Sequence, residues 1–389
     1  MAGASSGGSV VSVVCSRLTV PLHTPFVTAL RRTQTCDTLL VRVTDSDGVV
    51  GWGEAPQVWQ VTGESLASAA ACVEQMLASS VVGRPVDDWR EASVACQRTV
   101  ARNFGAKAAV DVALHDLAAR RSGRPLAQLL ADEYGAPRPD GGRSSAMTQV
   151  SSDVTLSAGS AGDLGARAAA RVADGFSTLK MKVGTDAATD VARVRMVREA
   201  VGPQVGLRLD ANQGWTREEA VDVIRALEAA DLGVELVEQP VAGEDVEGLA
   251  WVRSRVGLPV MADESLYSVV DLDRIVRLGA ADLVNVKLAK CGSLAVGARL
   301  LRRAAEAGLG TMVGTMMESH VGVGAAASLV AALPTSVTND LDAAWWAARS
   351  PFEGGLAYDG STIALPGAPG LGITGVDLRG LHRPAPDLR

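Results

Sequence analysis

The stretch "LRLDANQGW" (residues 207–215) is followed almost at once by "REEAVDVIRALEAAD" (residues 217–231), and together they decide the fold. The first begins as an apolar run of the kind found in buried strands and ends in Asp210, before a polar turn that contains glycine. The second has apolar residues at the spacing of an amphipathic helix. This strand–turn–helix unit predicts a βα repeat, and it raises the question of which cation Asp210 binds.

The same unit recurs through the second part of the chain. Short β-type runs follow one another at regular intervals with helical segments between them: "STLKMKV", "VELVEQP", "LPVMADES", "ADLVNVKLA", "LGTMVGTM" and "SVTNDLD". An earlier run, "DVTLS", brings the number of strands to eight. Strands that alternate with helices in this way predict a parallel (β/α) barrel.

The first third of the chain mixes strands and helices. "LLVRVTDSDGVVGWGEA" (residues 39–55) is typical of a β-hairpin with an Asp-Gly turn. "GAKAAVDVALHDLAARRSG" (residues 105–123) predicts a helix that ends before Gly123. "PRPDGGRSS" (residues 137–145) has the composition of a linker.

Composition and charge exclude several classes of partner. The chain has 389 residues and a net charge of -7, so it has a sizeable core and no basic face for nucleic acid. Its longest uncharged apolar run, "VGVGAAASLVAAL", is too short to span a bilayer. The start, "MAGASSGGSV", is typical of a loose tail rather than a signal peptide. Five irregularly spaced cysteines without a CxxC pair indicate reduced thiols in the cytoplasm: Cys15, Cys36, Cys72, Cys96 and Cys291.

Polar residues stand at the ends of seven successive predicted strands. They are Lys180, Lys182, Asp210, Glu238, Asp263, Lys287, Thr315, Asp340 and Asp342. In parallel barrels the active site lies at the carboxyl ends of the strands. We therefore expect these side chains to converge on one pocket.

Three consecutive strands end in Asp210, Glu238 and Asp263. Three carboxylates brought together repel one another unless a cation joins them. Ligation by oxygen alone, with open positions, suits Mg²⁺. The alternative is that each carboxylate caps the helix that follows it, but three such residues in register favour the metal.

Lysines flank these carboxylates. Lys180 and Lys182 are two residues apart on one strand and face the same side, whereas Lys287 comes four strands later, across the barrel. This arrangement predicts proton removal from one face of a carbon and return to the other, with Lys180 lowering the pKa of Lys182 by repulsion. The alternative is that the lysines form salt bridges or are solvated. Lys290 falls beyond the strand, and we expect it at the surface or behind the site.

Asp340 and Asp342 share one face of the last strand. A pair of carboxylates on a pocket wall, separate from the metal ligands, is suited to a cationic group, and a substrate ammonium is the natural candidate. The alternative is a pair that caps a loop.

The strand-end motifs "KMKVG", "LDANQGW", "VEQP", "ADES" and "VKLAKCG" resemble those of the muconate-lactonizing branch of the enolase superfamily. The resemblance covers nearly the whole chain. It implies a (β/α)7β TIM-like barrel, an α+β capping domain and one Mg²⁺ per subunit. The implied divisions are a flexible tail over residues 1–9, the capping domain over 10–143, the barrel over 144–345, and a segment over 346–389 that returns to the capping domain.

Within that branch the chain is most similar to dipeptide epimerases. "NDLD" resembles the pair that holds the α-ammonium of the dipeptide, and "GTMMES" resembles their seventh-strand motif with Thr315 where cysteine is more usual. "PFVTALRRT" and "GWGEAPQVWQVTGES" resemble their capping loops. By the same match, Arg31 contacts the acidic side chain of glutamate and Thr155 contacts substrate. "CGS" (residues 291–293) departs from the two glycines that are usual there.

The resemblance implies a Mg-dependent epimerase that inverts the α-carbon of the second residue of L-Ala-D/L-Glu or a similar L-Ala-Xaa dipeptide. Lys182 would remove the proton from one epimer and Lys287 would reprotonate the other face, through an enediolate that the metal stabilises. Lys180 would orient the substrate carboxylate. Asp340 and Asp342 would hold the ammonium.

Other functions stay open at this point. N-succinylamino acid racemases and o-succinylbenzoate synthases share the metal and the lysines, although the aspartate pair argues against their anionic N-acyl end. A cycloisomerase of the same branch, a Schiff-base aldolase and a binding-only barrel are further alternatives. The expected setting is the cytoplasm and cell-wall peptide metabolism, with a small dipeptide as partner, no nucleic acid or membrane, and a homo-oligomeric assembly.

Overall fold

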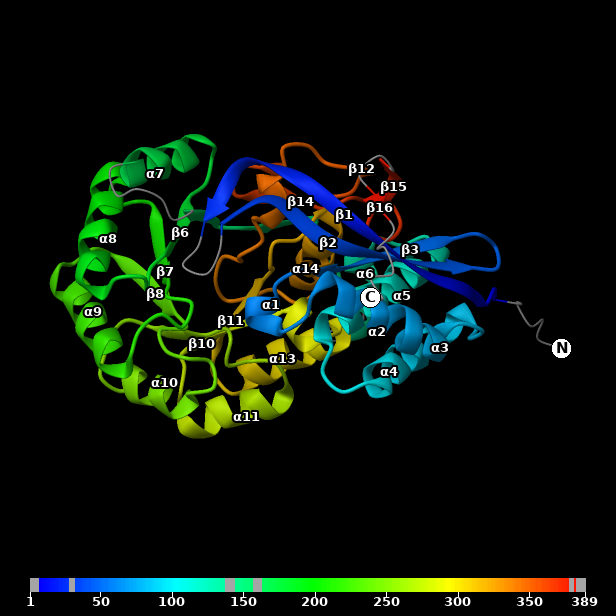
Figure 1. Cartoon of the computed structure of the whole chain (residues 1–389), viewed down its shortest axis with the longest axis horizontal. Coiled ribbons are helices and arrows are strands. Elements are labelled where there is room, and N and C mark those ends of the chain that lie inside the picture. Colours follow the sequence, from blue (N-terminus) through cyan, green and yellow to red (C-terminus); the bar gives the residue numbers. More distant parts are fainter. Residues whose placement is uncertain (1–6, 28–31, 137–143, 157–162, 378–380, 383–389) are drawn as a thin grey trace, which may run out of the picture.

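A curled parallel sheet surrounded by helices forms the larger part of the molecule, and long antiparallel strands with a layer of helices form the rest (Figure 1). The structure is a computed structural model that describes residues 7–27, 32–136, 144–156, 163–377 and 381–382. Arg31 therefore lies outside the described residues, as do residues 137–143 of the predicted linker.

The parallel sheet contains the predicted strands in chain order. They are β5 (Val154–Leu156), β6 (Thr178–Lys182), β7 (Gly206–Asp210), β8 (Val234–Glu238), β9 (Val260–Ala262), β10 (Leu283–Lys287) and β11 (Gly310–Gly314). The helices between and after them are α7 (Leu164–Ala173), α8 (Ala187–Val201), α9 (Arg217–Ala229), α10 (Val246–Arg253), α11 (Val269–Leu278), α12 (Leu288–Cys291), α13 (Leu294–Glu306) and α14 (His320–Ala332). The fold is the predicted (β/α)7β barrel.

The predicted eighth strand is reduced to two residues that close the ring. Asn339 forms an isolated parallel bridge with Ser152, and Asp340 forms one with Gly314. The chain then turns into a 3-10 helix (Ala343–Trp346), so no longer ladder forms. The closure still carries Asp340 to the same edge of the sheet as the other strand ends.

Alternation along the strands separates apolar from polar side chains. In β6, Leu179 and Met181 are fully buried in the main hydrophobic core, while Lys180 and Lys182, which alternate with them, belong to the opposite face. A separate cluster of four apolar side chains forms a small core of its own: Leu236, Met261, Leu283 and Met312. The alternation therefore places the two lysines of β6 on the face of the strand opposite to the apolar core.

The capping part is built on β1 (Val10–Val27), β2 (Arg32–Asp45) and β3 (Val50–Pro56), with β16 (Leu381–His382) beside β1. The predicted hairpin is confirmed by the pairing of β2 with β3 and by Gly48, whose φ is 81°. The helices are α1 (Trp59–Thr62), α2 (Leu66–Cys72), α3 (Ala78–Val81), α4 (Trp89–Thr99), α5 (Phe104–Arg121) and α6 (Leu126–Tyr134), with a π-helix (Val73–Leu77) and a 3-10 turn (Val86–Asp88).

Close packing of β3 on α5 requires glycine. A Cβ atom at Gly53 would lie 1.8 Å from the carbonyl oxygen of Ala109, and one at Gly51 would lie 2.1 Å from that of Ala113. The alternating glycines of "VGWGE" therefore let the strand backbone rest directly on the helix. The predicted helix is confirmed as α5, which ends at Arg121 shortly before Gly123.

The segment after the barrel contacts the capping helices. It contains β12 (Phe352–Gly354) paired with β15 (Ile373–Val376), and β13 (Ala357–Asp359) and β14 (Thr362–Ala364) beside β4 (Gln149–Ser151). Leu371 N donates to Asp116 Oδ1 of α5 at 2.6 Å. These contacts agree with a segment that returns to the cap, whereas the predicted domain boundaries stay a prediction.

Two features of the sequence have simple structural outcomes. Within the described ranges no helix has the length and apolarity needed to cross a membrane.

All five cysteines are buried thiols. Burial, with a smaller contribution from Glu74, raises the pKa of Cys15 to about 12, so this thiol stays protonated and unreactive.

Glu54 of β3 joins the cap to the barrel. Its carboxylate accepts hydrogen bonds from Ser319 N at 2.7 Å, Ser319 Oγ at 2.6 Å and Gly322 N at 2.8 Å. These donors lie at the N-terminus of α14, where helix N–H groups have no partner within the helix. One cap residue thus holds the helix that follows the seventh barrel strand.

Glu54→Ala is expected to lower the free energy of unfolding by about 3 kcal/mol, because three buried donors lose their acceptor. Urea unfolding followed by circular dichroism measures the change, and Glu74→Ala, at an exposed position of the cap, is the control. An unfolding midpoint equal to that of the control would contradict the role of Glu54.

Candidate active site

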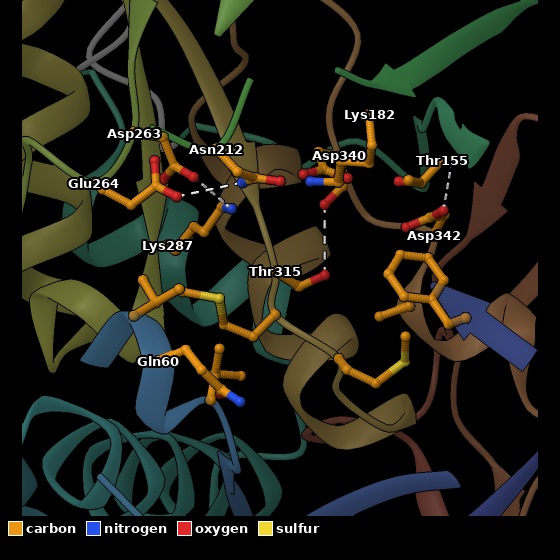
Figure 2. A pocket seen from close by; sticks show the side chains of 16 residues that line it. Gln60, Thr155, Lys182, Asn212, Asp263, Glu264, Lys287, Thr315, Asp340 and Asp342 are labelled. Atoms are coloured by element: carbon orange, nitrogen blue, oxygen red, sulfur yellow. Dashed lines mark hydrogen bonds and ion pairs between the residues drawn. The ribbon is translucent and has the colours of Figure 1, made fainter. Parts of the chain in front are cut away.

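One pocket lies between the strand ends of the barrel and the cap (Figure 2). It contains seven of the predicted site residues: Thr155, Lys182, Asp263, Lys287, Thr315, Asp340 and Asp342. The cap contributes Phe26, Val58, Gln60 and Val61, and barrel loops add Asn212, Glu264, Met316, Met317 and Ala343. The expectation that the strand ends converge on one pocket is confirmed for these residues.

The two predicted bases face each other across this pocket. In Figure 2, Lys287 lies beside Asp263 and Glu264 on one side, and Lys182 lies beside Asp340 on the other. Lys182 Nζ is 2.6 Å from Asp210 Oδ2, and Lys287 Nζ is 2.9 Å from Asp263 Oδ2. Each lysine is thus paired with one of the predicted metal ligands.

Lys180 lies beneath the pocket and is fully buried. Its Nζ contacts Glu238 Oε2 at 2.7 Å, Asp340 Oδ2 at 2.8 Å and Asp210 Oδ2 at 3.0 Å. Burial disfavours the ammonium, but these three carboxylates outweigh it and raise the pKa of Lys180 well above its usual value.

Asp210 ends β7 and is fully buried. Residues 212 and 213 have left-handed backbones, with φ of 43° for Asn212 and 69° for Gln213, and this turn brings Asn212 N to 2.9 Å from Asp210 Oδ1. Burial raises the pKa of Asp210, but Lys180 and Lys182 outweigh it and hold the carboxylate ionised.

None of the three carboxylates caps a helix. The side chains that cap α9, α10 and α11 are those of Thr216, Asp245 and Ser268. The alternative interpretation of Asp210, Glu238 and Asp263 as N-caps is therefore wrong. Local sequence already supplies a better cap in each loop, which leaves the strand-end carboxylates for another partner.

Asp263 is held from several sides. Its backbone N–H donates to Gln239 Oε1 at 2.8 Å, and Lys290 Nζ contacts both its carboxylate and its carbonyl oxygen. Lys290 is fully buried, which excludes the surface alternative and confirms the expected position behind the site; the short helix α12 turns the side chain back under the site. Although burial acts against ionisation, Lys287 and Lys290 lower the pKa of Asp263 far below its usual value.

The donor set fits Mg²⁺ in chemistry. Asp210, Glu238 and Asp263 are at most 1% exposed and offer only oxygen. Burial and the charge of Asp210 raise the pKa of Glu238, as expected for crowded carboxylates. Among the described residues the carboxylates do not converge on a common point as metal ligands would, because lysine ammonium groups lie between them.

Asp342 is fixed through one oxygen. Its Oδ2 accepts hydrogen bonds from Thr155 N at 2.7 Å and Trp346 Nε1 at 2.9 Å. Asp342 precedes the 3-10 helix without a capping bond from its side chain, which argues against the loop-cap alternative. Burial and the neighbouring Asp340 raise the pKa of Asp342 to about 6.

Three further positions were singled out from the sequence: Thr315, Ser293 and Arg31. Thr315 lines the pocket, and its N–H donates to the carbonyl oxygen of Asp340 at 3.0 Å. Ser293, where the related motif has glycine, caps α13 by accepting from Ala295 N and Val296 N. The serine therefore serves the helix after Lys287. The role of Arg31 stays a prediction, since this residue is not among those described.

Two motifs, "LDANQGW" and "ADES", contain pocket residues that were not predicted from the sequence as site residues. Asn212 follows Asp210 by two residues, and its Nδ2 donates to Glu264 Oε1 at 3.3 Å. Glu264 directly follows Asp263. Tyr267, just beyond, donates its hydroxyl to the carbonyl oxygen of Val61 in the cap at 2.8 Å. Their position inside or beside "LDANQGW" and "ADES" was the available signal.

Comparison with known proteins agrees with this architecture. An L-Ala-D/L-Glu epimerase of Bacillus subtilis is 41% identical over 95% of this chain and 98% of its own. A dipeptide epimerase from Enterococcus faecalis, solved with Mg and the dipeptide L-Leu-L-Tyr, has a TM-score of 0.87 at 35% identity, over 94% of this chain and 100% of that one. An N-succinyl-L-Arg/Lys racemase of Bacillus cereus is 31% identical over 91% of this chain and 92% of its own.

Family matches cover both parts of the chain. Residues 10–131 match the mandelate racemase/muconate lactonizing enzyme N-terminal domain, and residues 163–377 match the enolase C-terminal domain-like family. With the strand-end carboxylates and lysines in the order described above, these matches assign the chain to the mandelate racemase/muconate lactonizing enzyme family of the enolase superfamily.

Proposed function

We propose that this protein is a Mg²⁺-dependent dipeptide epimerase that inverts the α-carbon of the second residue. The observation that carries the proposal is the pair Lys182 and Lys287 on opposite sides of one pocket, with Asp342 fixed on its wall. Similarity to the L-Ala-D/L-Glu and other dipeptide epimerases supports the same reaction.

The reaction needs two proton transfers at one carbon. Lys182 would take the α-proton from one epimer, and Lys287 would give a proton to the opposite face; in the reverse direction the two exchange roles. Lys180, buried under the pocket, would orient the carboxylate of the substrate. Asp340 and Asp342 would bind the ammonium of the first residue, which places the second residue's α-carbon between the lysines.

Asp210, Glu238 and Asp263 are the residues proposed to hold Mg²⁺. When bound there, Mg²⁺ would supply positive charge beside the carboxylate of the substrate as the α-proton leaves. Lysines contact these carboxylates in the structure described, so metal binding would replace part of their ion pairing. That exchange would free the lysine side chains to turn towards the substrate.

We propose glutamate, or a similar residue, at the second position of an L-Ala dipeptide. The support is the similarity to L-Ala-D/L-Glu epimerases and the predicted contact of Arg31 with an acidic side chain. Thr155 and Thr315 are proposed substrate contacts, since both line the pocket. We place the reaction in the cytoplasm and in cell-wall peptide metabolism, and a homo-oligomeric assembly stays a prediction.

The second candidate is an N-succinylamino acid racemase, because a relative with that activity is 31% identical. Its substrates carry an anion where a dipeptide carries an ammonium. Two buried carboxylates on the pocket wall would repel that anion. The dipeptide is therefore the better match to the charge of this pocket.

Incubation with pools of L,L-dipeptides in D₂O and Mg²⁺, followed by mass spectrometry, tests the function directly. A gain of about one dalton at the second residue's α-carbon is expected, and both EDTA and Lys182→Ala should abolish it. L-Ala-L-Glu is expected to lead the reacting dipeptides. Exchange in N-succinylamino acids with none in any dipeptide would assign the protein to the racemases instead.

The pH dependence of kcat/KM should report Asp342. Its pKa is raised to about 6, so the carboxylate is ionised above that pH and neutral below it. Since a neutral Asp342 cannot attract the ammonium, kcat/KM for L-Ala-L-Glu is expected to fall as the pH drops through about 6. Rates measured from pH 5 to 8 test this, and a profile that stays level down to pH 5 would contradict it.

A further inference from the structure

Trp346 is a buried residue that the proposed reaction leaves without a role. We propose that Trp346 is a positioning residue that orients Asp342 for the ammonium of the dipeptide and couples this orientation to strand β1 of the cap. The inference rests on the proposed function, because it assumes that the substrate carries an ammonium.

The hydrogen bonds of Asp342 leave one oxygen for a ligand. Trp346 Nε1 and Thr155 N both donate to Oδ2, and among the described residues no hydrogen bond ends on Oδ1. Asp342 lines the pocket and is 5% exposed. With Oδ2 held from two directions the carboxylate cannot rotate freely, and Oδ1 is the oxygen available to a cation in the pocket.

The direction of the indole N–H is set by the cap. The ring of Trp346 stacks on His23 with centroids 5.2 Å apart, and it meets Phe26 edge-on at 5.6 Å. Both partners belong to β1, and Phe26 also lines the pocket. Trp346 is 3% exposed, so its ring has little freedom to turn away from Asp342.

The backbone reinforces this contact. Ala348 N donates to the carbonyl oxygen of Pro21 at 2.8 Å, and Leu22 forms an antiparallel bridge with Ala347. The end of β1 is therefore attached to the short segment that follows Asp342. A shift of β1 would move the indole, and with it the carboxylate that Trp346 holds.

The chemistry of the indole suits this task. An indole N–H can only donate, so it favours the ionised form of Asp342, the form that binds an ammonium. This effect opposes burial and Asp340, which favour the neutral acid. A phenylalanine at this position would keep the aromatic contacts with His23 and Phe26 but would lose the donor.

The test compares Trp346→Phe with Trp345→Phe. Trp345 is the matched control, because it belongs to the same aromatic cluster and its ring lies 5.1 Å from that of Trp346, while the indole bond to Asp342 comes from Trp346 alone among the described residues. With L-Ala-L-Glu, Trp346→Phe is expected to raise KM roughly 10-fold or more, the usual cost of losing a hydrogen bond to a charged group, with little change in kcat.

A substrate analogue without the ammonium separates positioning from general packing. Propionyl-L-glutamate has the shape of L-Ala-L-Glu but no cation, so its inhibition constant should be the same for wild type and Trp346→Phe. The acidic limb of kcat/KM should also move to higher pH in Trp346→Phe. Asp342 is surrounded by Asp340, Lys180, Asp153 and Tyr358, and these groups are unchanged in the variant.

Each outcome decides the question. Equal losses in both variants, or equal weakening of L-Ala-L-Glu and propionyl-L-glutamate, would overturn the inference while wild-type exchange leaves the proposed function intact. Absence of exchange by wild type with every dipeptide would overturn the function and the inference together. If Trp346→Phe does not fold, benzothienylalanine incorporated at position 346 replaces only the N–H with sulfur, and the same predictions apply to that protein.

Discussion

Lys287→Ala is expected to abolish epimerisation, with a loss of about 10³-fold or more, the scale of a lost general acid–base group. Lys182 faces the other side of the pocket and stays in place. Lys182 should still exchange the α-proton of the epimer whose α-hydrogen points towards it. When the amine of Lys182 takes that proton it becomes an ammonium, which can rotate and return a solvent deuteron to the same face of the carbon. Deuterium exchange without inversion is therefore the expected result.

Proton NMR in D₂O measures exchange, and chiral chromatography of the recovered dipeptide measures inversion. Lys182→Ala is the reciprocal variant and should exchange only the opposite epimer. Lys107→Met serves as the control, because Lys107 is another buried lysine, bonded to the carbonyl oxygen of Gln97 within the cap. Inversion at the wild-type rate by Lys287→Ala would rule out the two-base arrangement.

Glu238→Gln is expected to weaken Mg²⁺ binding and to lower kcat/KM by roughly 10³-fold at fixed Mg²⁺. The glutamine keeps the size of the side chain and its acceptor for Asn285 Nδ2, which donates to Glu238 Oε1 at 2.8 Å. It removes one of three negative charges, and a hard cation binds most strongly to charged oxygen. Calorimetric titration with Mg²⁺ measures affinity without reference to activity.

Glu318→Gln is the matched control for this substitution. Glu318 is also a buried glutamate, but burial and the nearby Glu54 raise its pKa to about 8, so it is mostly neutral at pH 7. A glutamine there replaces a neutral acid and should leave the affinity for Mg²⁺ unchanged. Should Glu238→Gln bind Mg²⁺ as tightly as this control, Glu238 would have to be removed from the proposed metal ligands.

The barrel and the polar strand ends could be predicted from the sequence because both depend on local patterns. In β6, alternation separates Leu179 and Met181 from the two lysines, and one strand of five residues already contains that information. Regular repetition of strand and helix then brings the carboxyl ends of all strands to one edge. The motif around Asp210 could therefore be assigned to a site before any contact was known.

The tertiary structure decided which groups contact one another. From the sequence, Lys290 could lie at the surface or behind the site, and the short turn of α12 buries it against Asp263. The helix-cap alternative failed for Asp210 because Thr216 and Glu219 already cap α9 reciprocally. The identity of the residue at the strand end does not show which side chain in the following loop becomes the cap. In both cases the deciding factor was the packing of a loop.

The sequence by itself determined the repeat, the edge on which the site lies and the chemical types of its residues, because these follow from side-chain periodicity along single elements. The tertiary structure alone decided that Asp342 is held by Thr155, 187 residues away, and that Glu54 caps a helix 265 residues away. Such contacts have no local signal, since they form only when the cap closes on the barrel and the buried polar groups must find partners.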